Sequence, residues 1–228
     1  MNFKKLLISN FLAVFAVFSI QNLQADYEDP LFLLYEKDVL LTTSLSKQTK
    51  HLLLKQEFAV GISDRMNFKA GIGYRESYDN NEDGQEPFNL ALIYRTGEAK
   101  GDEFLLDIFL EYELGGNDAL PQSSANTISV GLRGGYQFER FTSAIIVDWN
   151  GRDGRYFFDI ALDNQIRFDE VNSANLKFEY KDNGIFNMEK NITAQFNRLI
   201  GETLFSFGGG YDLKNQSILL LWSMSFVF

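Results

Sequence analysis

The residues of this chain with the most chemical potential are charged side chains that recur at every second position. Between Phe104 and Leu114, Asp107, Glu111 and Glu113 alternate with large apolar residues. Successive side chains of a β-strand point to opposite faces, so these three acids would share one face of a strand. An apolar core could not hold them, because burying an unpaired charge is costly. The charged face must therefore contact water or cations.

The same alternation in other segments selects further charged residues on the face opposite to the apolar one. Eight of them are cationic: Lys55, Lys69, Arg75, Arg95, Arg133, Arg155, Arg167 and Lys177. Nine are anionic: Glu57, Asp107, Glu111, Glu113, Asp148, Asp159, Asp163, Glu179 and Glu189. The near balance predicts an interior of paired charges rather than rings of one dominant sign.

Long strands must position these residues, and the sequence predicts twelve of them, with no convincing helix period. They cover residues 38–47, 51–62, 67–78, 88–96, 103–114, 126–138, 140–150, 155–168, 173–180, 186–198, 203–211 and 217–228. An even number of antiparallel strands brings both chain ends to one side and gathers the polar loops 79–87 and 115–125 on the other. Ten strands is the alternative, through the first pair or the 163–175 region.

The segment from Ser217 to Phe228 carries a family signature. One face of this predicted strand holds Trp222, Met224, Phe226 and Phe228. It resembles the closing strand of bacterial outer-membrane β-barrel proteins, in which a C-terminal Phe after alternating apolar residues is read by the barrel-assembly machinery. The resemblance names this superfamily and no specific family. It implies an all-β, transmembrane, antiparallel up-and-down β-barrel of about twelve strands (ten possible) in the Gram-negative outer membrane.

The beginning of the chain has the pattern of a secretory signal peptide. Lys4 and Lys5 precede a mostly apolar stretch from Leu6 to Ile20, and the small-residue site ends at Ala25. We expect cleavage after Ala25, which gives a signal peptide over 1–25 and one outer-membrane β-barrel domain over 26–228. The apolar stretch is too short for a membrane-spanning helix, which needs roughly 20 residues.

The composition excludes several classes of function. The formal net charge of −10 argues against nucleic-acid binding, and the absence of cysteine removes thiol catalysis, thiolate metal sites and disulfides. Aromatic residues make up 15% of the chain, including 22 Phe, which suits rings that face lipid. A soluble β-sandwich or lipocalin-like barrel is the competing interpretation, because alternation does not say where the apolar face points.

His51 is the single histidine, and its neighbourhood suggests one candidate catalytic pair. If Gln48 and Thr49 form a tight turn, Ser46 stands opposite His51, with Glu57 farther along. Some outer-membrane barrel enzymes that cleave lipid acyl chains use Ser and His, but theirs face the lipid. Here the pair would face the interior, so a lipid hydrolase is only the weakest alternative and no catalytic residue is expected.

The loop from Asp79 to Gly84 begins like a calcium-binding loop, with carboxylate or amide groups at positions 1, 3 and 5 and glycine at position 6. Position 12 is Leu90, where the bidentate Glu should be, so the match fails. We therefore expect a solvated acidic loop, with weak divalent-cation binding that helps to bridge lipopolysaccharide as the alternative. No dedicated metal site and no cofactor are expected.

The charged face also allows one specific contact to be predicted. A register that places Tyr94 opposite Phe104, and Phe138 beside Phe141 of the next strand, brings Asp107 near Arg133 on the adjacent strand and Glu111 near Ser129. Losing one partner of such a confined pair would leave an uncompensated charge. Asp107 and Arg133 should therefore be energetically coupled.

These observations favour a small passive pore with a mixed-charge lumen. The alternative is a structural or surface-interaction barrel whose lumen is closed. The expected partners are outer-membrane lipids, lipopolysaccharide, the barrel-assembly machinery and small polar solutes. Small twelve-stranded porins for acidic sugars are comparable in size, but their interiors are expected to be mainly basic, and this one is not.

Overall fold

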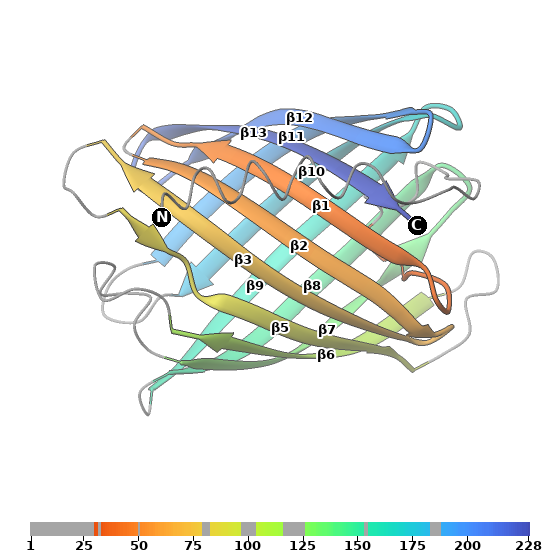
Figure 1. The fold of residues 1–228 in the computed structure, drawn as a ribbon, viewed down its shortest axis with the longest axis horizontal. Coiled ribbons are helices and arrows are strands. Elements are labelled where there is room, and N and C mark those ends of the chain that lie inside the picture. Colours follow the sequence, from red (N-terminus) through yellow and green to blue (C-terminus); the bar gives the residue numbers. More distant parts are fainter. Residues whose placement is uncertain are drawn as a thin grey trace.

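The computed structural model describes residues 30, 31, 33–49, 51–78, 83–96, 104–115, 126–152, 155–182 and 188–228, which form an antiparallel β-barrel (Figure 1). Twelve long strands build it: β1 (Val39–Lys47), β2 (His51–Ser63), β3 (Met66–Ser77), β5 (Phe88–Arg95), β6 (Phe104–Leu114), β7 (Thr127–Gln137), β8 (Phe141–Arg152), β9 (Arg155–Arg167), β10 (Asn172–Asp182), β11 (Met188–Ile200), β12 (Thr203–Asp212) and β13 (Ser217–Val227). The predicted number of strands is confirmed, and ten is wrong. The predicted signal peptide and its cleavage site lie outside the described residues.

The sheet closes on itself, which leaves no open edge between the first and last strands. β13 pairs with both β12 and β1, and the remaining long strands each pair with their neighbours in chain order. At the seam, the backbones of Val39 and Phe228 exchange two hydrogen bonds of 3.0 and 2.8 Å. A closed barrel satisfies its backbone groups internally, as a sheet surrounded by lipid must.

One short strand, β4 (Gly84–Gln85), departs from the simple pattern. It pairs only with Tyr74 and Arg75 of β3, while β5 pairs with the other half of β3, from Met66 to Gly71. Among the described residues, no helix is long and apolar enough to cross a membrane.

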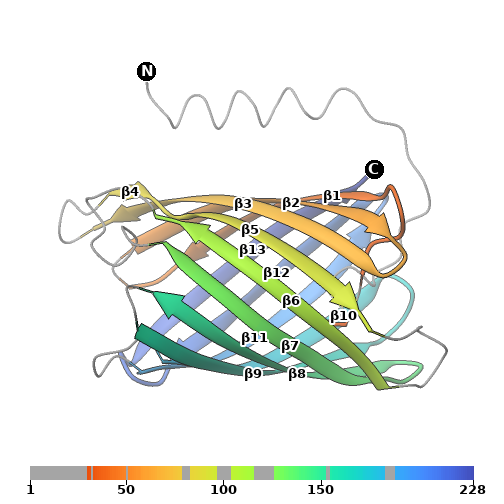
Figure 2. The ribbon, with the colours of Figure 1, turned by 90° about the horizontal axis from the view of Figure 1, so that it is seen from below.

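The barrel has two unlike ends, and its strands run obliquely between them (Figure 2). The terminal end is the one where β1 begins and β13 ends, and the loop end carries the longer β3–β5 and β6–β7 connections. Turns at the terminal end are held locally. In the β9–β10 turn, the Asn172 side chain and the backbone N–H groups of Val171 and Asn172 donate to Asp169, which holds the pKa of that carboxyl below its usual range.

The apolar face of the strands points outward. Leu110, in the middle of β6, is 50% exposed, and Trp149, toward the loop end of β8, is 61% exposed. Aromatic rings pair across neighbouring strands near both ends, as in Phe104 with Tyr136 at a centroid distance of 5.2 Å and Trp149 with Phe158 at 5.5 Å. A soluble β-sandwich or lipocalin-like barrel would bury its large apolar side chains in a core, so that interpretation is wrong. Outward aromatic rings near both ends of the strands are the arrangement typical of barrels with aromatic girdles.

The register of β5, β6 and β7 gives one confirmation and one correction. Asp107 pairs with Arg133, as expected. Tyr94 pairs with Ile108 and not with Phe104, because the β5–β6 ladder starts at Arg95 and Asp107 and leaves a connection longer than a tight turn.

Candidate functional site: the barrel interior

The interior face carries the charged residues that alternate with the outward-facing apolar ones. By strand register, this face includes Lys55, Glu57, Lys69, Arg75, Arg95, Asp107, Glu111, Glu113, Arg133, Asp148, Asp159 and Arg167. The structure does not gather them into one site. It separates a buried cluster toward the terminal end, a cavity at the loop end and further charges dispersed over the rest of the interior face.

Asp107 is the centre of the buried cluster. Its side chain is completely buried, and its two carboxylate oxygens accept hydrogen bonds from Arg95 Nε at 2.8 Å and Nη2 at 3.2 Å. Arg133 Nε and Nη2 also donate to Asp107, at 2.8 and 2.5 Å. Two guanidinium groups therefore share one carboxylate, and the geometry is that of a positioned structural ion cluster rather than a mobile pore lining.

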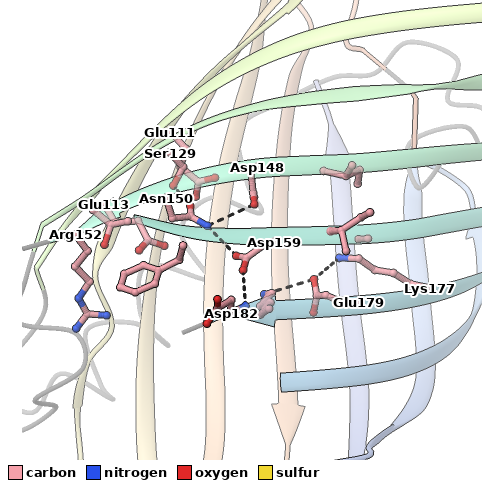
Figure 3. A pocket seen from close by; sticks show the side chains of 16 residues that line it. Glu111, Glu113, Ser129, Asp148, Asn150, Arg152, Asp159, Lys177, Glu179 and Asp182 are labelled. Carbon is pink, nitrogen blue, oxygen red and sulfur yellow. Dashed lines mark hydrogen bonds and ion pairs between the residues drawn. The ribbon is translucent and has the colours of Figure 1, made fainter. Parts of the chain in front are cut away.

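The cavity lies at the loop end, against the inner face of β6 to β10, and has a volume of about 320 Å³. Figure 3 shows its side chains converging from these neighbouring strands. Its ionisable lining consists of Glu111, Glu113, Asp148, Arg152, Asp159, Lys177, Glu179, Lys181 and Asp182. Six of these groups are acidic and three are basic, so the cavity does not share the near balance of the whole interior.

An asparagine links two of the acids in this cavity. Asn150 Nδ2 donates to Asp159 at 2.9 Å and to Asp148 at 3.4 Å (Figure 3). The backbone N–H of Asp182 donates to the other oxygen of Asp159 at 2.9 Å. The Ser129 hydroxyl in turn donates to the side-chain amide oxygen Oδ1 of Asn150. This network fixes the two carboxylates in adjacent positions on β8 and β9 without supplying a positive charge.

Both lysines of the cavity lie close to Glu179. Lys177 Nζ lies 2.9 Å and Lys181 Nζ lies 3.4 Å from Glu179 Oε1. Arg152 is the third cation of the lining, beside the remaining acids. The part of the cavity formed by β6, β8 and β9 is consequently the more negative part.

The other predicted charges lie apart from both groups. Lys55 and Glu57 of β2 face the interior and are exposed, so the lumen is accessible to solvent at their level. Arg75 forms an ion pair of 2.5 Å with Glu86, which follows β4. Lys69 on β3 and Arg167 at the terminal end of β9 are half-buried.

The proposed pairing of Ser46 with His51 is wrong. Ser46 pairs with Leu53, and the Gln48 N–H donates to the His51 carbonyl oxygen at 2.9 Å, because the β1–β2 turn has a different register from the one assumed. Opposite His51 on β3 is Ser77. The structure thus offers no support for a catalytic pair at Ser46.

Metal binding finds no geometric support in the part of the chain that the structure describes. Within those ranges, no group of three or more His, Asp or Glu side chains is placed to hold a metal ion. Most of the loop that begins like a calcium site lies outside the described residues.

Sequence reasoning missed two features of the interior. The first is Asn150, whose parity with Asp148 would have placed it among the interior polar groups. The second is the segment before β1: Leu31 and Leu34 are 1% and 2% exposed and contact the interior face. No periodic signal marks this segment, because it forms neither a strand nor a helix.

The C-terminal strand lies where the sequence resemblance requires a closing strand to lie. Trp222, Met224 and Phe226 share the outward parity of β13, and the rings of Phe226 and Phe228 stack at 6.5 Å. We expect deletion of Phe228 to lower the amount of folded barrel in the outer membrane severalfold, because the resemblance implies that the barrel-assembly machinery reads this strand before the sheet closes. Heat-modifiable mobility on gels measures this, with Phe141→Ala as the control for loss of another outward aromatic. Normal accumulation would contradict the assembly role.

The fold is that of the bacterial outer-membrane β-barrels, a class in which closed antiparallel sheets present apolar residues to lipid. No protein-family profile and no curated protein sequence matches the chain. Among solved structures, the KdgM porin in complex with disordered oligogalacturonate has a TM-score of 0.67 at 10% identity, over 83% of this chain and 99% of that one. The COG4313 outer membrane channel from Pseudomonas putida F1 has a TM-score of 0.62 at 12% identity, over 92% and 100%. The Acinetobacter baumannii outer membrane protein Omp33 gives 0.52 at 4%, over 85% and 99%.

Proposed function

We propose that this chain is a passive outer-membrane pore for small polar solutes, with a mixed-charge lumen. The observation that carries the proposal is the interior face, where exposed Lys55 and Glu57 and a polar cavity of about 320 Å³ replace a packed apolar core. A barrel of about twelve strands lies between small filled barrels and wide porins, so a narrow pore fits its size. The terminal end faces the periplasm, as in single-chain bacterial barrels.

The net negative charge of the cavity lining indicates which solutes the pore favours. Six acids against three bases, two of which are engaged with Glu179, would repel an acidic oligosaccharide. Oligogalacturonate, the ligand in the structurally similar KdgM porin, is therefore not a solute that we propose for this chain. Neutral or cationic small solutes suit the lining better.

Planar-bilayer recording of the refolded protein tests the pore itself. We expect discrete conductance steps in potassium chloride and, in liposomes, swelling in small neutral sugars. A protein that is fully folded by gel mobility but gives neither signal would overturn the pore.

The same recording tests the cavity charge. In a salt gradient, the reversal potential should show a modest preference for cations, because the more negative wall concentrates them. Glu111→Gln together with Asp148→Asn should move the permeability ratio toward unity. Glu170→Gln is the control, since Glu170 is exposed in the β9–β10 turn and its loss changes the net charge without touching the cavity. An anion preference of the unaltered protein would contradict this assignment.

A second candidate is a structural or surface-interaction barrel with a closed lumen. It is favoured by the burial of interior residues toward the terminal end, such as Ser173 and Asn197, both 0% exposed. This candidate predicts no conductance at all, so the bilayer experiment separates the two. In either case we propose that the mature chain begins near Asp26 and that lipopolysaccharide and the barrel-assembly machinery are its partners.

A further inference from the structure

The segment before β1 turns back into the barrel. We name it the strap and define it as residues 30, 31 and 33–37. Lys37 N donates to Gly61 O at 2.8 Å, and Gly61 N donates to Asp38 O at 3.0 Å, so the strap starts against the terminal end of β2. Lys37 has a left-handed φ of 75°, and the Asp38 N–H donates to Tyr35 O at 3.1 Å. This tight turn reverses the chain from the barrel wall into the bore.

The apolar side chains of the strap pack on the inner wall. Leu31 is 1% exposed and clusters with Leu105 of β6 and Ala144 of β8. β2 and β8 are separated by β3, β5, β6 and β7 in the ring of strands. A segment that is anchored at Gly61 on β2 and reaches Leu105 on β6 and Ala144 on β8 therefore lies inside the bore, against the inner wall formed by these strands.

The polar groups of the strap backbone are satisfied by side chains of the wall. With its amide oriented to match its neighbours, Asn67 accepts from Leu34 N at 2.7 Å and donates to Leu34 O at 3.1 Å. Arg95 Nη2 donates to Leu31 O, while Asp107 holds the same guanidinium. Non-helical backbone inside a barrel is stable only when the surrounding protein satisfies it in this way.

The wall also leaves space for the strap at one position. A Cβ atom on Gly61 would lie 1.8 Å from Tyr35 O and 2.6 Å from Tyr35 C, which are backbone atoms that cannot move aside locally. Glycine at 61 is thus required by the close approach of the strap. Gly71 is another inward glycine, on the neighbouring strand. The atom nearest to a Cβ at this position would be the Glu57 Cγ, at 3.3 Å.

We propose that the strap is a built-in constriction that determines what passes through the terminal end of the pore, and that Arg95 is its positioning residue. This inference rests on the proposed function, because a constriction has a permeability role only in a conducting barrel. Interior side chains at the same end are buried, as Thr142, Gln165 and Ser206 show, whereas Lys55 and Glu57 nearer the loop end are exposed. The narrow part of the lumen therefore coincides with the strap.

The experiment displaces the strap without altering a charge of the lumen. In the refolded full-length protein, Gly61→Ala should expel the strap from β2 and raise the single-channel conductance severalfold. Gly71→Ala should leave the conductance unchanged. If Gly61→Ala yields too little folded barrel, Leu31→Ser with Leu34→Ser weakens the same packing, and Tyr35→Ser is its control because Tyr35 is 69% exposed. Unchanged conductance in folded strap variants would overturn the constriction.

A chemical measurement separates failure of this inference from failure of the pore. Since the chain has no cysteine, Ala144→Cys gives a single thiol beneath Leu31. A membrane-impermeant maleimide should label it slowly in the otherwise unaltered protein and severalfold faster when Gly61→Ala is added. Faster labelling without conductance in any variant would support the strap as an obstruction and overturn the pore. Equal, rapid labelling in both proteins would show that the strap does not cover the wall.

Discussion

Replacing Asp107 with asparagine should destabilise the barrel by about 3–5 kcal/mol, because it leaves two buried guanidinium groups without their shared counter-charge. Asp107 is completely buried, and the side chains of Arg95 and Arg133 are 8% and 12% exposed, so water cannot replace the lost carboxylate. Urea unfolding of the refolded protein, followed by tryptophan fluorescence, measures the change.

A double-mutant cycle shows whether the loss comes from this cluster. Arg133→Gln combined with Asp107→Asn should be less destabilised than the sum of the single variants, since removal of one cation relieves the excess positive charge. Glu57→Gln is the control, because Glu57 also faces the interior but is exposed, and it should change stability by about 0.5 kcal/mol or less. If the losses of stability in the two single variants simply add up in the double variant, Asp107 and Arg133 are not coupled.

The contrast between Asp107 and Glu57 shows how far the sequence leads. Both residues have interior parity, and two-residue alternation is sufficient to predict this for each. Their burial differs because Asp107 lies next to the strap and Glu57 does not. Burial at a given height of a barrel depends on what fills the bore there, and alternation carries no information about it.

The strands were predictable for a physical reason that does not extend to the strap. A strand between lipid and a polar lumen must alternate along its whole length, so its pattern is local and repeated. Leu31 and Leu34 are held by Ala144, Asn67 and Arg95, which come from strands far away in sequence. Such contacts exist only once the barrel has closed.

The sequence predicts which charged residues face the interior, but not which of them meet in the cavity. Asp148 and Asp159 face each other in the β8–β9 ladder, while Glu111 belongs to β6. The turn lengths that set these registers cannot be read reliably from turn residues, as the wrong placements of Ser46 and Tyr94 show. An error of two residues preserves the face of every side chain and changes all its neighbours.

The glycines of β7 provide the last prediction, because neighbouring positions should respond differently to the same substitution. A Cβ atom on Gly135 would lie 2.0 Å from Ser143 O and 2.8 Å from Ala144 Cα, both backbone atoms of β8. On the outward-facing Gly134, the nearest atom would be Phe104 Cζ at 2.9 Å, the far end of a ring that can turn toward lipid.

Gly135→Ala should therefore cost about 1–3 kcal/mol, since β7 and β8 must separate to accept the methyl group. Gly134→Ala should stay within about 0.5 kcal/mol, because removal of a flexible glycine from a strand offsets the displacement of the ring. Parallel unfolding curves of the two variants decide the matter, and the folded yield of each gives a second measure. Equal stability of both would mean that β7 and β8 approach less closely than the barrel geometry requires. A larger loss for Gly134→Ala would mean that packing of Phe104 in the aromatic girdle, and not backbone proximity on the inner face, limits substitution on this strand.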